Sequence, residues 1–192
     1  NKMWLGVTGF VSDMVFAVPK GTVVPQAYKE KAEKLGYVGD YTRLGNSCWF
    51  TNIEHGRRHQ PLQLMTMADN IKFSKHKDLR GKEYLHYDNY DAINVNETSD
   101  IPCDYDGVMG VPITFLCKYN PEQFEIIGCA DYTGKYGSDD IGVSRIGEEW
   151  IAKYREQGGR GHYTANMTSL VYYDTNGKAC NTFKRILIRR KK

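Results

Sequence analysis

The chain has 192 residues, of which 26% are charged and 41% apolar, and its formal net charge is only +3. A chain of this length buries about 70% of its unfolded surface, so it needs neither disulfides nor a structural metal to fold. The small net charge excludes a protein coated in basic residues. Any nucleic-acid surface must therefore come from local clustering of lysine and arginine.

Cysteine usage indicates a reducing compartment. The five cysteines are an odd number, widely spaced and without a C-x-x-C pair, which is typical of reduced thiols in a cytoplasmic protein; they are Cys48, Cys103, Cys117, Cys129 and Cys180. We find no secretory leader and no apolar run long enough to cross a membrane. Because the chain begins with Asn1 rather than Met, we expect it to be part of a longer protein.

The first 55 residues read as alternating strands and one helix. Short apolar runs bounded by glycine and proline predict strands, and a run rich in Ala, Glu and Lys predicts a helix. The strands are expected at 4–7, 14–18 and 47–53, and the helix at 26–35. Pro25 opens this helix at a position that tolerates proline, and Gly36 ends it.

Residues 55–86 carry a cluster of basic side chains, interleaved with Phe73 and Tyr84. Hydrophobic periodicity is poor in this stretch, which predicts loop with short elements. Residues 87–106 have the opposite character, because they are acidic and aromatic.

The remaining elements give the fold class. We predict strands at 111–117, 124–129, 167–173 and 182–188, and an amphipathic helix at 148–156. Asn176-Gly177 indicates a tight turn between the last two strands. The pattern predicts an α+β fold with more strand than helix.

Two basic clusters are the candidates for DNA contact. Lys and Arg neutralise phosphates, and Arg also reads base edges in the major groove. The candidate DNA-binding residues are Arg57, Arg58, His59, Lys72, Lys75, Lys77, Arg80, Arg185, Arg189 and Arg190. The alternative is a solvated loop and a frayed basic chain end.

Three further interpretations concern metal sites. His55 and His59 have a metal-ligand spacing but no third ligand, so we expect ordinary histidines and no metal. Asp104 and Asp106 resemble the start of a calcium loop that lacks its closing Glu. The acidic run 88–106 offers carboxylates for the Mg²⁺ of a nuclease, but capping of turns and pairing with lysines is the favoured interpretation.

The tyrosines of this region, Tyr84, Tyr87 and Tyr90, are candidates for stacking on an extruded base. Aromatic residues at such density more often belong to the core, and that is the favoured interpretation here.

Four stretches of the sequence are distinctive, GNSCWFTNIEHGRRH (45–59), YDNYDAINV (87–95), SDIPCDYDGVMGVPITFLCKYNPEQFEIIG (99–128) and RILIRRKK (185–192). In these stretches the chain resembles the EcoRI-type adenine-specific DNA methyltransferase family. The resemblance implies transfer of a methyl group from S-adenosylmethionine to the N6 amino group of adenine in double-stranded DNA, with the base extruded from the stack. Members carry a glycine-rich cofactor turn and an Asn/Asp-Pro-Pro-Phe/Tyr tetrapeptide that holds the adenine.

Neither family motif is present in this chain. The nearest approach, Asn120-Pro121-Glu122-Gln123-Phe124, lacks the second proline. It is better interpreted as a helix start, with Asn120 as N-cap and Gln123 closing a capping box. Likewise, 132–137 is no cofactor turn, because it has no strand-to-helix frame. We therefore assign no catalytic residue and do not expect the chain alone to bind S-adenosylmethionine.

The family order of motifs implies two regions. Residues 1–55 are expected to be the last strands and a helix of a Rossmann-like catalytic domain, and residues 56–192 a β-rich target-recognition region. The expected partners are double-stranded DNA and an N-terminal catalytic half of the same enzyme, with no membrane. The alternatives are a Mg²⁺-dependent nuclease and a non-catalytic DNA-binding module.

Overall fold

The computed structural model describes residues 8–11, 15–43, 48–51, 56–130 and 141–192. In these ranges the fold is mixed α+β. The α-helices are α1 (Gln26–Glu33), α2 (Met67–Phe73) and α3 (Glu148–Glu156); the strands are β1 (Thr8–Val11), β2 (Val15–Ala17), β3 (Tyr41–Arg43), β4 (Cys48–Thr51), β5 (Ile93–Asn94), β6 (Met109–Pro112), β7 (Phe124–Ala130), β8 (Val171–Tyr173), β9 (Ala179–Asn181) and β10 (Arg185–Arg190); the 3-10 turns are η1 (Gly56–His59), η2 (Thr98–Asp100) and η3 (Ile113–Cys117).

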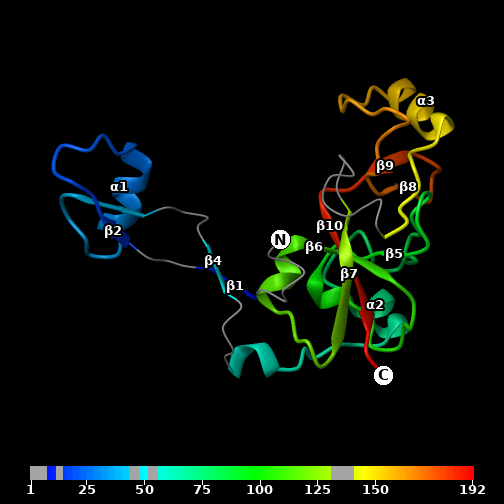
Figure 1. The fold of residues 1–192 in the computed structure, drawn as a ribbon, viewed down its shortest axis with the longest axis horizontal. Coiled ribbons are helices and arrows are strands. Elements are labelled where there is room, and N and C mark those ends of the chain that lie inside the picture. The colour runs from blue at the N-terminus through cyan, green and yellow to red at the C-terminus, as the bar shows by residue number, and fades with distance from the viewer. Residues whose placement is uncertain (1–7, 12–14, 44–47, 52–55, 131–140) are drawn as a thin grey trace.

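Residues 15–43, here called the N-terminal unit, form a small structure at one end of the molecule (left in Figure 1). Strands β2 and β3 pair antiparallel, and α1 packs beside β3. Pro25 is the N-cap of α1, and after Lys34 the chain leaves the helix through Gly36, whose φ of 86° is open to glycine at no steric cost.

A two-stranded ribbon lies between the N-terminal unit and the rest of the protein (Figure 1). Its strands β1 and β4 are antiparallel, with Thr8 opposite Thr51 and Val11 opposite Cys48. Strand β1 lies beside η3. Residues 56–192, here called the body, contain the largest sheet and the hydrophobic core.

The body is built on a four-stranded sheet of order β5-β6-β10-β7. Strand β10 comes last in the chain yet lies between β6 and β7, antiparallel to both. The sheet is completed by β5, which is parallel to β6. A bulge at Ile127 shifts the β7–β10 register, because Leu187 faces Gly128 while Ile188 faces Ile126.

Both faces of β10 are buried. Successive strand side chains point to opposite faces, and the four residues 185–188 are all buried. Ile186 and Ile188 enter one core cluster with Phe115 and Phe124, whereas Leu187 enters a second cluster on the other face. The continuous apolar run ILI (186–188) is therefore explained by a central strand covered on both sides.

A third cluster lies at the other end of the body, where α3 packs on the β8–β9 pair. Trp150 is stacked on Tyr154, with ring centroids 5.0 Å apart, and Tyr163 meets both rings edge-on. Asn89 ties this end to the sheet. Its amide donates to the carbonyls of Ser144 and Ser169 and accepts from the Val171 N–H.

Several predicted elements are confirmed. Helix 148–156 has the predicted bounds, and β7, β2, β4 and α1 lie within or beside their predicted ranges. The Asn176-Gly177 turn is confirmed, because the Gly177 N–H bonds to the Asp174 carbonyl between β8 and β9. The strand predicted at 4–7 lies outside the described residues.

Two strand predictions are wrong in part. The run 111–117 leaves the sheet after Pro112, which brings no N–H to a continuing ladder, and continues as η3. In 167–173, strand β8 begins only at Val171. The backbone before it bonds elsewhere, because Met167 closes a turn on Thr164 and the Ser169 carbonyl accepts from Asn89.

The α+β class is thus confirmed, and the assignment of 1–55 to a catalytic sheet stays a prediction. Among the described residues no helix has the length and apolarity needed to span a bilayer. Within the described part of the chain, Cys103, Cys117, Cys129 and Cys180 form no disulfide.

Candidate nucleic-acid interface

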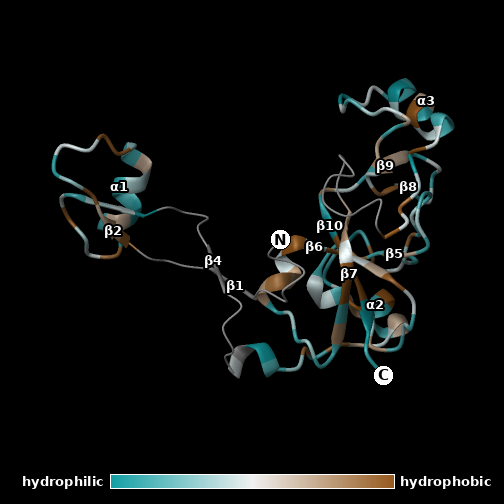
Figure 2. Cartoon of the chain, in the orientation of Figure 1, coloured by the Kyte–Doolittle hydropathy of each residue, from teal (hydrophilic) through white to brown (hydrophobic). Residues whose placement is uncertain are grey.

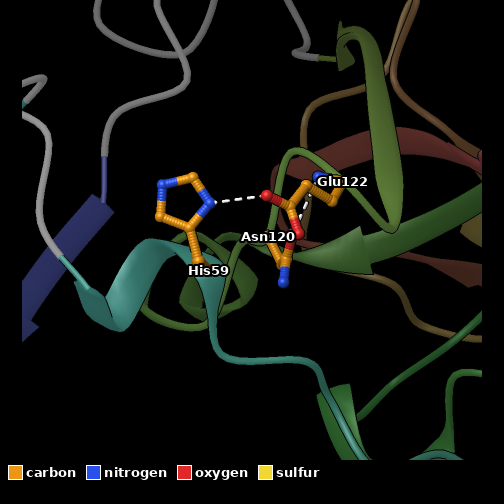
Figure 3. A network of polar contacts seen from close by, with 3 residues as sticks. All are labelled: His59, Asn120 and Glu122. Atoms are coloured by element: carbon orange, nitrogen blue, oxygen red, sulfur yellow. Dashed lines mark hydrogen bonds and ion pairs between the residues drawn. The ribbon is translucent and has the colours of Figure 1, made fainter.

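The first basic cluster lies on η1 and is joined to the turn before β7. The His59 ring contacts Glu122, with Nδ1 2.7 Å from Oε1 (Figure 3). Arg58 is half-buried and lies near Tyr119. Burial raises the pKa of the Tyr119 phenol, and the Arg58 guanidinium opposes that rise. The Arg57 side chain and His55 lie outside the described residues.

The turn at 120–124 is not the helix start that its sequence suggested. Asn120 Oδ1 accepts from the Glu122 N–H at 2.7 Å (Figure 3), and the Asn120 carbonyl accepts from Gln123 and Phe124. The chain then enters β7 directly. The prediction of a helical N-cap at Asn120 is wrong because this short turn feeds a central strand, whose packing outweighs the local capping signal.

Gln123 does not close the predicted capping box, because its side chain bonds the backbone of Leu62 instead. Its side-chain amide donates to the Leu62 carbonyl at 3.1 Å, and its Oε1 accepts from the Leu62 N–H at 2.6 Å. One amide thereby satisfies both backbone groups of Leu62, in the manner of a neighbouring strand. These two hydrogen bonds fix the connector 60–65, which joins η1 to α2, against the turn before β7.

The second part of the basic stretch begins at α2. Thr66 caps this helix, since its Oγ1 accepts from the Asp69 N–H and donates to the Asp69 carboxylate. The cations that follow are all at the surface; Lys72, Lys75, Lys77 and Arg80 are exposed. The Lys72 ammonium lies 5.0 Å from the centre of the Phe73 ring, which is itself 56% exposed.

A buried polar network holds this segment in place. Asp100 accepts from Ser74 Oγ at 3.0 Å, and its carbonyl accepts from Asn70 Nδ2 and from the Tyr84 hydroxyl. Burial raises the pKa of Tyr84 well above its ordinary value, and Asp100 and Asp104 add to the rise. The exposed cations are therefore presented from a fixed support.

The three arginines of β10 differ in environment. Arg185 is only 8% exposed, and its guanidinium donates to the side-chain carbonyls of Asn94 and Asn96. Arg189 is exposed and Arg190 is half-buried. Arg185 is thus buried, whereas the two arginines that follow it are exposed or half-buried.

The acidic run does not form a metal site in the part of the chain that is described, where no group of three His, Cys, Asp or Glu side chains is placed to hold an ion. Its members have structural partners instead. Asp104 accepts from the Met67 N–H at the start of α2, and Asp106 lies 3.5 Å from the Lys192 ammonium.

The tyrosines of this region belong to the core, as favoured. Tyr84 and Tyr87 are 8% and 5% exposed, so stacking on an extruded base is wrong for these two rings. The Tyr87 hydroxyl donates to Asn94 Oδ1 at 2.8 Å. It also lies against Gly110, where a Cβ atom would be 2.3 Å from the hydroxyl oxygen. Tyr90 is partly buried against the second core cluster.

Comparison with known proteins agrees with the resemblance. The sequence model of the family described as "Adenine-specific methyltransferase EcoRI" matches residues 1–191. The chain is 42% identical over 130 residues to the type II methyltransferase M.EcoRI of Escherichia coli, a match that covers 66% of this chain and 35% of that protein. No solved structure matches the chain.

Two mycoplasma proteins are also similar. The chain is 37% identical over 131 residues to the type II methyltransferase M.MgeORF184P of Mycoplasma genitalium, covering 67% of this chain and 37% of that protein. It is 43% identical over 89 residues to the type II methyltransferase M.MpnI of Mycoplasma pneumoniae, covering 46% and 25%. The chain thus spans about a third of the length of M.EcoRI and M.MgeORF184P. Since the family model matches almost every residue, this chain belongs to the EcoRI-type adenine-specific methyltransferase family.

Proposed function

We propose that this chain is the C-terminal, DNA-recognising portion of a site-specific adenine-N6 DNA methyltransferase of the restriction-modification type. The observation that carries the proposal is the set of exposed cations on a fixed support, Lys72, Lys75, Lys77 and Arg80, in a chain that belongs to this family. Such cations neutralise phosphates and orient a protein on duplex DNA.

The chemistry of methyl transfer is assigned to a missing N-terminal half. When bound there, S-adenosylmethionine supplies the methyl group. The candidate clamp at 120–124 does not fit that chemistry, because the Asn120 side-chain carbonyl is engaged by the Glu122 N–H at 2.7 Å. No step of the reaction is therefore placed on a residue of this chain.

The N-terminal unit supports the same division. Leu35, Tyr37 and Val38 are 47%, 47% and 77% exposed, so the unit leaves apolar surface in water. Exposed apolar surface of this kind marks an interface. We propose that 1–55 completes its core against the N-terminal catalytic half, as the last strands and a helix of that domain.

In this proposal the basic residues have two roles. The cations of 72–80, η1 and the end of β10 contact phosphates. The buried Arg185 positions the segment 94–96 through its two amide partners.

Complementation is the test that decides the proposal. The 192-residue chain is mixed with a separately produced N-terminal half of the same enzyme, and incorporation of labelled methyl groups into duplex DNA is measured. We expect methylation from the mixture and none from either part alone. Robust methylation by the chain alone contradicts the proposal.

Two further results separate the rival functions. Cleavage of DNA with added Mg²⁺ that is lost in Asp104→Asn and Asp106→Asn identifies a nuclease. Tight sequence-specific DNA binding without any gain of activity on adding the N-terminal half identifies a non-catalytic module. The proposed half-enzyme instead binds DNA weakly, with affinity that falls steeply as salt rises.

A further inference from the structure

A groove of about 350 Å³ lies between the connector 60–64 and the ends of η2 and η3. This volume falls in the range of sites that hold small ligands. The side chains that line it and carry polar groups are Gln60, Gln63, Thr98, Ser99, Cys117 and Lys118. Among the described residues that line the groove, none is acidic.

One wall of the groove is the extended connector. Leu62 and Leu64 are half-buried and pack against the first core cluster, whereas Gln60 and Gln63 are exposed. The backbone of Leu62 is held by both groups of the Gln123 amide. The two glutamine amides are thus carried on a strand-like segment whose position is fixed.

The opposite wall supplies hydroxyl groups and one cation. Thr98 and Ser99 come from η2, and Lys118 is the exposed residue that ends η3. Two carboxylates adjoin them in the chain. Asp100 is 3% exposed and accepts from Ser74 Oγ, and Glu97 is exposed but does not line the groove. The groove therefore combines amides, hydroxyls and an ammonium.

The groove lies between the two basic segments. Its first lining residue, Gln60, directly follows η1 with Arg58 and His59. At the η2 side, the Ser74–Asp100 bond places Ser74, and hence its neighbour Lys75, beside the residue that follows Ser99. The groove is thus close to both basic segments, η1 on one side and the segment that begins at Ser74 on the other.

We propose that the groove holds one nucleotide of the bound DNA strand, with the Lys118 ammonium on a phosphate and the Gln60 and Gln63 amides on a base edge. A glutamine amide offers a donor and an acceptor side by side, which matches the N6 and N7 pair of adenine. The lysine supplies a point charge that any sequence accepts. This inference rests on the proposed function and names where that function reads DNA.

Protection of a thiol tests the position of the groove. The full chain is treated with N-ethylmaleimide, with and without a random-sequence 20-base-pair duplex at low salt, and alkylation of Cys117 is followed by mass spectrometry. Cys180, a reduced and half-buried cysteine away from this groove, is the internal control. We expect DNA to slow alkylation of Cys117 at least fivefold and to leave Cys180 unchanged.

The outcomes distinguish failure of the proposed groove from failure of the proposed function. A chain that binds the duplex, seen as a mobility shift, while Cys117 is alkylated at its DNA-free rate overturns the groove and leaves the proposed function standing. A chain that binds no duplex even at low salt contradicts the proposed function itself.

Substitution of Lys118 tests the phosphate contact. For Lys118→Ala we expect weaker binding to every duplex and a salt dependence reduced by about one phosphate contact, that is by about 0.9 in the slope of log affinity against log salt. Lys20→Ala, an exposed lysine in the N-terminal unit, is the matched control and leaves the slope unchanged. Equal slopes for the two variants overturn this contact.

Substitution of Gln63 tests the base contact. Binding sites are selected from a randomised duplex library by the wild-type chain, by Gln63→Ala and by the exposed control Gln26→Ala. We expect Gln63→Ala alone to lose preference at one base pair, by about tenfold. A wild-type chain that selects no sequence, or a Gln63→Ala variant that selects as the wild type does, overturns the assignment of a base edge to Gln63.

Discussion

In the N-terminal unit the buried side chains are Ala32 and Thr42, whereas the body buries Phe115, Phe124 and Trp150 with 0% of their surface exposed. Figure 2 shows the same contrast, since α1 is largely hydrophilic and the strands of the four-stranded sheet carry hydrophobic stretches. Helices and strands can thus form where little core exists, but their stability must then come from another surface. The body supplies its own core, whereas in our proposal the N-terminal unit completes its core against the catalytic half.

The largest expected effect is in the core of the body. Phe124 meets Phe115 edge-on, with centroids 5.4 Å apart, so Phe124→Ala opens a cavity between rings. We expect a loss of about 3–5 kcal/mol in the free energy of unfolding, measured by denaturant titration. Phe183→Ala is the matched control, because that ring is 90% exposed, and it should change stability by less than about 0.5 kcal/mol.

The same titration applied to the N-terminal unit sharpens the contrast. Val38→Ala removes a side chain that is 77% exposed, and we expect a change within about 0.5 kcal/mol. A loss for Val38→Ala as large as that for Phe124→Ala would contradict the view that the two regions differ in burial.

A smaller effect is expected where the body relies on a polar side chain. Asn89 is 6% exposed and bonds three backbone groups, the carbonyls of Ser144 and Ser169 and the Val171 N–H. Asn89→Ala leaves these groups without their partner, which we expect to cost about 2–4 kcal/mol in the free energy of unfolding. Asn166→Ala, an exposed amide at the surface of the same end of the body, is the control and should leave the unfolding midpoint unchanged.

Sequence patterns predicted the elements that local signals determine. Helix α3 has acidic residues in its first turn, aromatic residues on one face and a stop at Gly158, whose φ is 78°. Strand β7 is an apolar run with a clear turn before it. Helix α2 was expected only as a short element, although Thr66 and Asp69 form a capping pair, because the basic residues around it obscure its periodicity.

The rest depended on contacts between distant parts of the chain. The pairing of β10 between β6 and β7 joins residues at least 55 positions apart. The groove has walls from 60–64, 98–99 and 117–118, and its fixed wall rests on a bond between Leu62 and Gln123, which are 61 positions apart. Gln63 stands in no motif, and the stretch 99–128 that contains Lys118 carries no signal that brings the two residues together.

The last prediction concerns the independence of the two regions. Ala32 is the buried residue of α1, and Ala32→Gly should destabilise this helix by about 1 kcal/mol, which is about a fivefold rise in opening. We expect faster hydrogen exchange at the amides of α1 and of the β2–β3 pair, with no change in β10. Ala152→Gly in α3 is the matched control. Its helix is held by Trp150 in the third core cluster, so its amides open only when that ring leaves its cluster, and slow exchange there should persist. If Ala32→Gly instead speeds exchange in β10, the N-terminal unit and the body unfold as one, and the apolar surface of the unit is then no sign of a missing partner.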